Sequence, residues 1–426
     1  MKKAPAAPEG SSYAARVQPV EAAGFQTWLV EDYAVPLVAF DFAFSSGSSQ
    51  DPDGKEGAVA MLATLFDEGA GSLDSEAFHQ ALDDKAIEIS FSADRDLLHG
   101  RLKTLTRHID AAFGLLRAAL VEPRLDPDAI ERMRAQMTAN LKREAKDPDA
   151  LVGRAWRETA FPNHPYGRAA RGTLDSLPRI ERSDLVGLRE RMSTRASVAA
   201  AAVGAIDAER LARLVEGVFA PLPATSALVS VPDVNLAGMG QRKLIDLDVP
   251  QATIRFGLPG LARHDPDYMA AVVVNHVLGG GVFSARLFKE VREKRGLAYS
   301  VHSQLVTHAH AGFFSGGTST KNERAAESLA VIEEEIEKLA SEGPSADELD
   351  KAKKYLIGSY ALRFDTSTKI ASHLVHLQSE GFPVDYLDRR NQEIANVTLE
   401  DTRRVAKRLF SQKKLLVAVA GRPEGL

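Results

Sequence analysis

The chain has 426 residues, of which 44% are hydrophobic and 26% charged, which is typical of a globular protein of two to three domains. With 53 lysines and arginines against 58 aspartates and glutamates, the formal net charge is −5, so no basic excess indicates nucleic acid as a partner. The absence of cysteine excludes disulfides, thiolate metal sites and a cysteine nucleophile.

The first residues, MKKAPAAPEGSS, contain two lysines but lack the apolar stretch of a signal peptide. Because Ala, Pro, Gly and Ser dominate this region, we predict a disordered tail over residues 1–15. Without a targeting signal a cytoplasmic location is the default, and a periplasmic location would need a leader removed before Met1. No run of about 18 uninterrupted apolar residues occurs, so we expect no membrane span.

Hydrophobic periodicity predicts the elements of the first half. We expect strands over residues 27–30, 37–44, 87–91, 99–105 and 197–203. We expect helices over residues 57–66, 107–120 and 127–143. A strand over residues 415–420 closes the second half. Strands followed by runs of helices favour an α+β fold, with helices on one face of a mostly antiparallel sheet.

Short motifs repeat along the chain at a nearly constant offset. Val35-Pro36 and Val249-Pro250 each open an alternating apolar segment, 214 residues apart. Asp51-Pro52-Asp53 and Asp265-Pro266-Asp267 follow at the same offset. Several repeats in the same order indicate two homologous halves of one fold.

The repeat divides the chain into domains. We predict an N-terminal half over residues 16–220 and a C-terminal half over residues 242–426, both of the α+β kind. Residues 221–241 between them are rich in Pro, Ala and Ser and almost free of charge, which is typical of an extended linker.

The most distinctive segment is LGGGVFSARLFKEVREKRGLAYSV at residues 278–301. Gly279, Gly280 and Gly281 form a flexible loop that lets the backbone come close to another group. A helix over residues 284–293 follows and ends at Arg295-Gly296, a basic last turn with a glycine cap. A strand begins directly after this cap.

Two side chains of this segment are candidates for binding. Arg292 lies at the end of the helix and Tyr299 on the strand, and a guanidinium and a phenol brought together could hold carbonyl oxygens of a peptide. Alternatively, Arg292 caps or salt-bridges its own helix and Tyr299 is half buried in the sheet. Spacing alone favours this second interpretation.

The segment resembles the C-terminal signature of the pitrilysin-type zinc peptidases (inverzincins), in the branch of the mitochondrial processing peptidases and their bacterial relatives. The resemblance extends over nearly the whole chain, including the Gly/Ser turn SSGSSQDPDGKEG and AFPNHPYGRAARGT at residues 160–173. The family's arginine–tyrosine pair falls on Arg292 and Tyr299, and the resemblance implies that both contact the peptide substrate. Val282 and Phe283 depart from members that have Met-Ser after the glycines.

A larger departure lies in the first half. Members of this family carry His-x-x-Glu-His, whose histidines bind zinc and whose glutamate activates water. Alignment on the preceding glycine places Ala60, Ala63 and Thr64 at these positions. The third zinc ligand falls near Asn140, with Glu144 one turn away. Since alanine cannot coordinate a metal, we predict that this chain holds no catalytic zinc.

The resemblance implies a division of work between two subunits. In two-gene members one subunit keeps the zinc site, and the other loses it and keeps the Arg/Tyr pair. We therefore predict a non-catalytic subunit of a heterodimeric zinc metallopeptidase, inactive alone, which closes the chamber and supplies Arg292 and Tyr299 to the partner's zinc site. The implied partners are a homologous His-x-x-Glu-His subunit, which carries the zinc, and unstructured peptides.

Two other functional interpretations stay open. The chain could be an inactive scaffold or peptide-binding protein with no peptidase partner, or an active peptidase with an unrecognised metal site.

His373 and His376 share a helical face but lack a matching carboxylate, which favours a structural role over metal binding.

Further histidines and acids could contact a substrate. His308 and His310 would alternate on a strand and, with His302, could line the chamber beside Tyr299. The acidic run Glu333 to Glu335 is most simply a solvated helix face, and otherwise a contact for a basic peptide.

Overall fold

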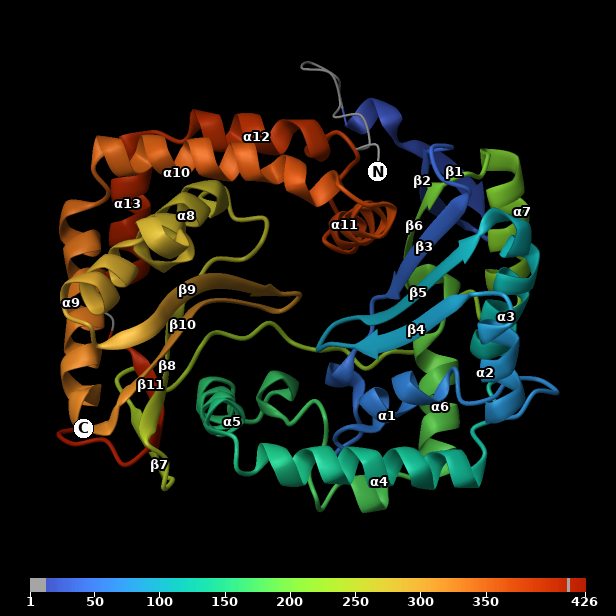
Figure 1. Ribbon diagram of the computed structural model, residues 1–426, viewed down its shortest axis with the longest axis horizontal. Helices are drawn as coiled ribbons and strands as arrows, with labels where there is room; N and C mark the ends of the chain where they lie inside the picture. Colours follow the sequence, from blue (N-terminus) through green and yellow to red (C-terminus); the bar gives the residue numbers. More distant parts are fainter. Residues whose placement is uncertain (1–12, 412–413) are drawn as a thin grey trace. The chain divides into compact units, whose positions relative to one another are not determined.

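The computed structural model describes residues 13–411 and 414–426. They form two compact units, each with one β-sheet and its own helices (Figure 1). The first unit comprises the described residues up to Leu141 and residues 169–230 and 361–389. The second unit comprises residues 142–168 and 231–360 and the described residues from Arg390 onward.

In the described part of the first unit, the sheet has six strands in the order β1-β2-β6-β3-β5-β4. Neighbours are antiparallel except for the parallel pair β2 and β6. The strands are β1 Gln18–Ala22, β2 Phe25–Glu31, β3 Leu37–Phe44, β4 Glu88–Ala93, β5 Leu98–Leu105 and β6 Val198–Gly204. Every strand predicted for this half is confirmed, and β1 is additional.

The core of the first unit lies between one face of this sheet and its helices. Phe40, Phe42 and Phe44 project from alternate positions of β3, and the Phe42 ring lies 5.4 Å from that of Phe219. Each buried phenylalanine stabilises the fold by about 1.5–3 kcal/mol. The helices are α1 Ala58–Leu65, α2 Ser75–Asp83, α3 Ile109–Val121, α4 Pro127–Glu144, α6 Arg182–Met192 and α7 Ala208–Phe219.

The second unit repeats this arrangement with the strand order β7-β11-β8-β10-β9 among its described residues. Only β7 and β11 are parallel neighbours. Its strands are β7 Arg242–Asp246, β8 Gln251–Pro259, β9 Ala298–His308, β10 Ala311–Lys321 and β11 Leu416–Gly421. Its helices include α8 Tyr268–Asn275, α9 Ala325–Glu342, α10 Ala346–Gly358, α12 Tyr386–Asn396 and α13 Leu399–Phe410. The α+β class and the two homologous halves are therefore confirmed.

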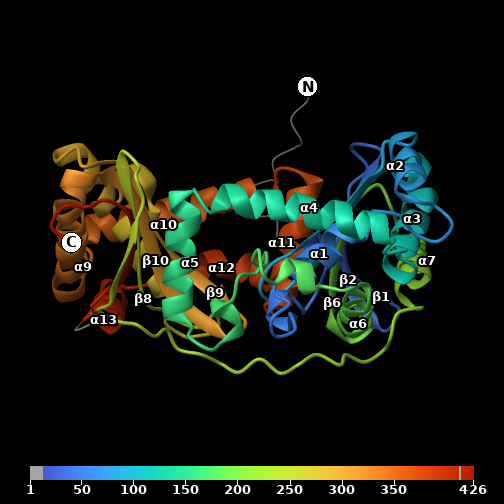
Figure 2. The same ribbon diagram turned by 90° about the horizontal axis from the view of Figure 1, so that it is seen from below.

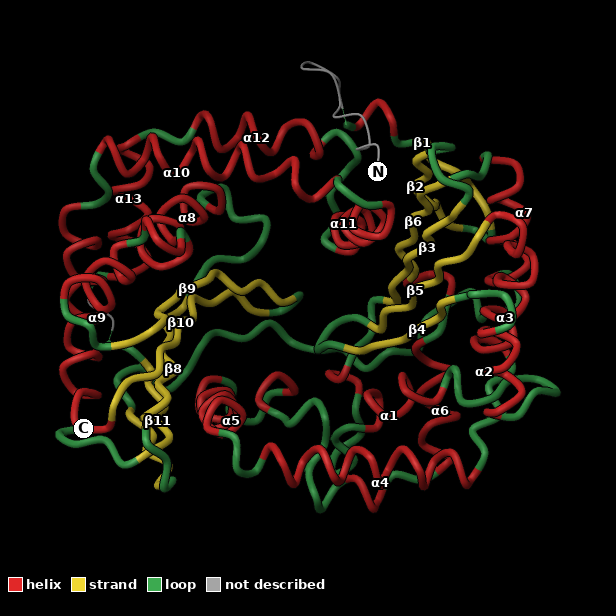
Figure 3. The backbone as a smooth tube through the Cα atoms, viewed as in Figure 1, coloured by secondary structure: helices red, strands yellow, loops and turns green. Residues whose placement is uncertain are grey.

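Two helices are exchanged between the halves of the sequence (Figure 3). α5 (Pro148–Ala160) belongs to the second unit and lies against β8 and β11. α11 (Ser367–Ser379) belongs to the first unit and lies against β3 and β6. The compact units thus differ from the contiguous halves predicted over residues 16–220 and 242–426.

Each exchanged helix covers the sheet face that the main helices leave free. On β11, Val417 and Val419 point into the main core, whereas Leu416 and Ala418 pack with Trp156 of α5. Helices therefore lie on one face as predicted, and a single exchanged helix lies on the other. Strand residues alternate between the faces, so both faces of the central strands are buried.

α5 and α11 are counterparts in the repeat. Both have 13 residues, and they begin 219 positions apart. Val152 and Trp156 of α5 are buried, and so are Ala371 and Val375 at the same positions of α11. Each helix therefore turns the same face to its sheet.

The segments outside the sheets have simple structures. Residues 220–241 contain no helix or strand (Figure 2). Of the predicted tail, residues 1–12 lie outside the described residues, whereas the Tyr13 ring stacks on that of Phe364 with centroids 4.3 Å apart. None of the described helices combines the length and apolarity that crossing a bilayer requires.

The first Asp-Pro-Asp turn starts a helix. The Asp51 carboxylate is 5% exposed and accepts hydrogen bonds from the backbone N–H groups of Gly57 and Val59, at 2.8 and 2.7 Å. These bonds satisfy donors that the first turn of α1 leaves without partners.

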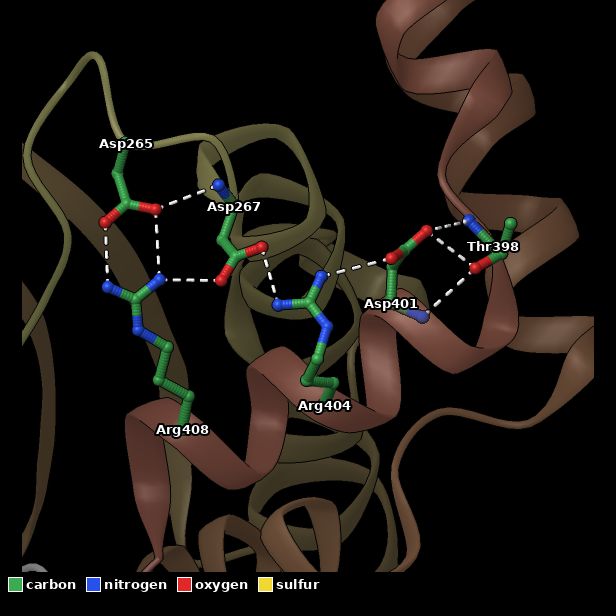
Figure 4. A network of polar contacts seen from close by, with 6 residues as sticks. All are labelled: Asp265, Asp267, Thr398, Asp401, Arg404 and Arg408. Atoms are coloured by element: carbon green, nitrogen blue, oxygen red, sulfur yellow. Dashed lines mark hydrogen bonds and ion pairs between the residues drawn. The ribbon is translucent and has the colours of Figure 1, made fainter.

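The second Asp-Pro-Asp turn forms an ion-pair network instead (Figure 4). Arg408 of α13 binds Asp265 at 2.8 Å and Asp267 at 2.6 Å, and Arg404 links Asp267 to Asp401. Hydrogen bonds from Arg408 hold the pKa of Asp265 below its usual value. The same repeated motif thus ties α13 to the loop before α8.

Candidate functional site

The glycine-rich segment of the second unit connects α8 to β9. A π-helical turn covers His276–Gly280, and the helix that follows contains a π-helical stretch over Phe288–Lys294. The helix ends where the Gly296 N–H donates to the Arg292 carbonyl at 3.0 Å, and Gly296 has a φ of +58°. Glycine adopts this left-handed conformation without steric cost, so the predicted glycine cap is confirmed.

The three glycines allow close packing. A Cβ at Gly279 would lie 2.4 Å from the Ser303 Oγ and 2.7 Å from the Ser303 backbone nitrogen. A Cβ at Gly281 would lie 2.7 Å from the His276 carbonyl oxygen. The group that the backbone approaches at Gly279 is therefore strand β9. Gly279 and Gly280 belong to the π-helical turn, and the flexibility of this segment stays a prediction.

Arg292 and Tyr299 lie in contact. The Arg292 Cζ is 4.5 Å from the centre of the Tyr299 ring and 4.9 Å from that of Phe288, so the guanidinium has two cation–π contacts. Tyr299 is 82% exposed, not half buried. The phenol and the guanidinium thus meet at the surface of the second unit.

The neighbours of Arg292 in its helix form ion pairs in which Arg292 does not take part. Glu290 pairs with Lys294 at 2.6 Å and with Arg295 at 2.7 Å. Among the described residues, no carboxylate pairs with Arg292. The interpretation that Arg292 forms an ion pair within its own helix is therefore wrong, and its N–H groups are available to an external acceptor.

A β-bulge places Tyr299 at the surface. On β10, Thr318 pairs with Val301 of β9 and Thr320 pairs with Ala298, so β9 has one residue more than β10 over this stretch. Val301 and Ala298 both point into the core as a result. A bulge of this kind re-aims side chains, here that of Tyr299.

The two threonines stabilise the bulge. The Thr318 hydroxyl donates to the Ser300 carbonyl at 2.8 Å, and the Thr320 hydroxyl donates to the Leu297 carbonyl at 2.6 Å. They replace ladder bonds that the extra residue interrupts. The alternation Thr-x-Thr opposite the motif is the sequence signal that could have indicated this bulge.

The positions that align with the zinc motif lie on α1. Ala63 is buried and Thr64 is exposed, with its hydroxyl donating to the Met61 carbonyl at 2.8 Å. Neither Ala60 nor Ala63 carries an atom that binds zinc, so the residues present do not fit this metal. At the third position, Asn140 accepts a hydrogen bond from the Gln136 amide at 3.2 Å.

The described residues contain no group of three or more His, Cys, Asp and Glu side chains that could hold a metal ion. We therefore assign no step of zinc chemistry to this chain.

The predicted histidine pair on β9 is separated. His308 ends the strand, but His310 lies in the following turn, contrary to the prediction that both alternate on a strand. The His310 Nδ1 lies 3.0 Å from an Asp233 oxygen, and the backbone N–H of His310 donates to the Tyr166 hydroxyl at 3.0 Å. The His308 ring lies 4.9 Å from the Tyr166 ring, so both histidines belong to a polar and aromatic cluster.

The other candidate histidines have separate surroundings. Burial, together with the positive charge of Arg255, lowers the pKa of His302. His376 pairs with Glu380 at 3.5 Å, and the His373 ring packs at 5.6 Å from that of Phe364.

The acidic run is engaged in ion pairs on α9. Glu333 lies 3.4 Å from Arg242. Glu334 and Glu335 both contact Lys338, at 2.7 and 3.1 Å. These pairs support a paired helix face more than a free acidic contact for a basic peptide.

Two family models match the sequence. The model of insulinase (peptidase family M16) matches residues 29–174, and the model of the peptidase M16 inactive domain matches residues 179–356. The non-peptidase homolog YmxG of Helicobacter pylori is 27% identical over 372 residues, which cover 87% of this chain and 86% of that protein. An uncharacterized zinc protease of Streptomyces coelicolor is 26% identical over 382 residues, which cover 88% and 82%.

Solved structures agree with the sequence relatives. The M16 inactive-domain protein of Pseudomonas fluorescens superposes with a TM-score of 0.89 at 25% identity, covering 96% of this chain and 98% of the other. A protease from Helicobacter pylori superposes with a TM-score of 0.86 at 18% identity, covering 95% and 99%, and this likeness concerns the fold alone.

Proposed function

This chain belongs to the M16 peptidase family, and on that basis we propose that it is the non-catalytic subunit of a heterodimeric zinc peptidase. It is inactive by itself and contributes Arg292 and Tyr299 to a peptide bound at the zinc site of a homologous partner subunit. The observation that carries the proposal is a combination. The surface pair is present, whereas α1 has Ala60 and Ala63 where zinc chemistry needs ligands.

The proposed task of Arg292 is to hold a carbonyl oxygen of the peptide. The rings of Phe288 and Tyr299 restrict the guanidinium before any peptide binds, so less side-chain entropy is lost on binding. The Tyr299 hydroxyl supplies a second donor. Donors fixed in advance around an oxygen that gains negative charge stabilise the transition state more than the ground state.

Affinity purification of the tagged chain from its native cells, followed by a fluorogenic-peptide assay with and without chelator, tests the proposal. We expect a second chain of similar length with His-x-x-Glu-His in the eluate, together with chelator-sensitive hydrolysis. Arg292→Ala is expected to lower kcat/KM of the complex by about 10²–10³-fold without dissociating it. Tyr299→Phe is expected to lower it as well, because one donor is lost.

Arg295→Ala is the matched control, because Arg295 lies in the same last turn but pairs with Glu290. This variant should retain the activity of the complex. Full activity of both Arg292→Ala and Tyr299→Phe would contradict the role proposed for the pair.

A scaffold or peptide-binding protein without a peptidase partner is the second candidate. Two observations favour it. Helix α1 has alanine where the zinc ligands would stand, and one relative is named a non-peptidase homolog. It predicts that the chain elutes alone and inert, and that Arg292→Ala changes nothing but local packing.

A further inference from the structure

A polar cavity lies in the first unit between α11 and the sheet. Its volume is about 340 Å³, near the lower end of small-molecule sites at about 300–1,000 Å³. It opens on the sheet face opposite the main core, between β3, β4, β5 and α11. Polar groups line it from all four elements, namely Asp41, Ser90, Ser92, Arg101 and Ser372.

Asp41 fixes Arg101 through one nitrogen. The Arg101 Nε lies 3.3 Å from both oxygens of the Asp41 carboxylate, which is itself buried. Within the described part of the chain, the two terminal nitrogens of this guanidinium have no acceptor. The hydroxyls of Ser90, Ser92 and Ser372 have no hydrogen bond there either. The cavity thus offers N–H and O–H donors that no described residue uses.

Two histidines that line the cavity, His99 and His376, pair with acids near it. His99 pairs with Asp94 at 3.1 Å, and His376 pairs with Glu380 at 3.5 Å. Neither Asp94 nor Glu380 lines the cavity, so Asp41 is the acid within it. Arg101 pairs with Asp41 through its Nε and also lines the cavity.

The second unit has different residues at the positions that correspond to Asp41, Arg101 and Val375. Arg255 occupies the position of Asp41, 214 residues later, and Gly317 stands opposite it on β10, where Arg101 stands opposite Asp41 on β5. On the exchanged helices, Trp156 corresponds to Val375. The Trp156 ring packs 5.7 Å from the Arg255 Cζ, and valine at the same position borders the cavity.

The same sheet and helix arrangement therefore forms without this ion pair. The Asp41 carboxylate is buried whereas the Arg101 side chain is 49% exposed, so desolvation of the carboxylate offsets part of their attraction and the pair is weak evidence for stabilisation. The first unit keeps a buried carboxylate, a half-exposed guanidinium with open donors and unfilled space together. Their combination points to a ligand.

We propose that this cavity binds a carboxylate carried by a peptide, either the C-terminal carboxylate or an acidic side chain. The terminal nitrogens of Arg101 form the two parallel hydrogen bonds for which a carboxylate has the matching shape. The serine hydroxyls of β4 and α11 complete the set of donors. The choice of a peptide as carrier rests on the proposed function, whereas the carboxylate site does not. Burial raises the pKa of Asp41 to about 6, which weakens its repulsion of a bound anion at mildly acidic pH.

Isothermal titration calorimetry on the purified full chain tests the proposal. The first probe pair is N-acetyl-Ala-Ala with a free carboxylate and its C-terminal amide. The second is N-acetyl-Glu-Ala-amide and N-acetyl-Gln-Ala-amide. We expect binding of at least one acid and about tenfold or more weaker binding of its matched amide. The pair that discriminates identifies the source of the carboxylate.

Two variants remove the site in different ways. Arg101→Gln keeps a polar side chain and removes the charge and the paired terminal nitrogens, and it should weaken binding about tenfold or more. Val375→Trp introduces the residue type that the second unit has at this position, Trp156. It should fill the cavity and abolish binding while thermal unfolding stays cooperative. Lys103→Gln is the control, because Lys103 lies on the same face of β5, pairs with Glu88 at 2.9 Å and does not line the cavity.

Equal binding of acids and amides, no binding of any probe, or equal loss in Lys103→Gln would overturn the proposal. So would unchanged binding by Arg101→Gln. If Val375→Trp fails to fold, Arg101→Gln decides by itself. The measurement needs no partner subunit, so its outcome is separate from that of the peptidase assay.

Discussion

Arg292 and Asp41 differ in their exposure to solvent, and this difference decides how each charge affects the protein. Arg292 lies at the surface, where a missing carboxylate partner costs little and leaves its donors free. Asp41 is 5% exposed, and burial raises its pKa to about 6 although Arg101 opposes the shift. The unfolded carboxyl titrates near 3.8, so folding takes up a proton between about pH 4 and pH 6. The stability that protonated Asp41 contributes is fully present below about pH 4 and is lost as the pH rises through 6.

Comparison with Asp41→Asn isolates this contribution, because the other titrating groups cancel. From pH 5 to pH 7.5, the free energy of unfolding of the wild-type chain should fall by about 1 kcal/mol relative to the variant. Urea unfolding at several pH values measures this difference. Parallel curves for the two proteins would show that Asp41 does not titrate differently on folding.

At the scale of elements, the glycine turn and the bulge on β9 position Arg292 and Tyr299. Gly279 lets the π-helical turn touch β9 at Ser303, next to the strand segment that carries Tyr299. The bulge then turns the tyrosine outward. A change at either element should therefore act on the site through packing.

Gly279→Ala should destabilise the chain by about 1–3 kcal/mol, because its Cβ would collide with Ser303, including the backbone nitrogen. Gly114→Ala is the matched control in the middle of α3, where an added Cβ meets nothing within 4 Å. That variant should be more stable by about 0.5–1 kcal/mol, because alanine favours helices. Thermal unfolding of both variants gives the comparison, and equal effects would argue against the close packing at Gly279.

At the scale of the whole molecule, the exchange of α5 and α11 makes each unit depend on both halves of the sequence. α5 covers Phe313 and Leu416 with the fully buried Trp156. Loss of a buried indole costs about 3–5 kcal/mol. Neither half of the sequence therefore contains all of a complete unit.

Residues 242–426 expressed alone should consequently aggregate or unfold at low temperature, because the face that α5 covers becomes exposed. Co-expression with residues 1–241 should give a soluble complex that elutes at the size of the full chain. Size-exclusion chromatography and circular dichroism follow both outcomes. A monomeric fragment 242–426 that unfolds cooperatively at the temperature of the full chain would contradict this expectation.

Local patterns in the sequence determined the strands, the glycine cap at Gly296 and the two homologous halves. These features depend on neighbours a few residues apart or on direct comparison of the two halves. The tertiary structure decided which sheet α5 and α11 cover. The two sheets are homologous, so the apolar pattern of each helix in the sequence matches both sheets equally well. It also decided the exposure of Tyr299, since one extra residue on β9 becomes visible only when β10 is paired with it. The cavity beside Asp41 arises likewise from Arg101 and Val375, which lie 60 and 334 residues away in the chain and meet only after folding.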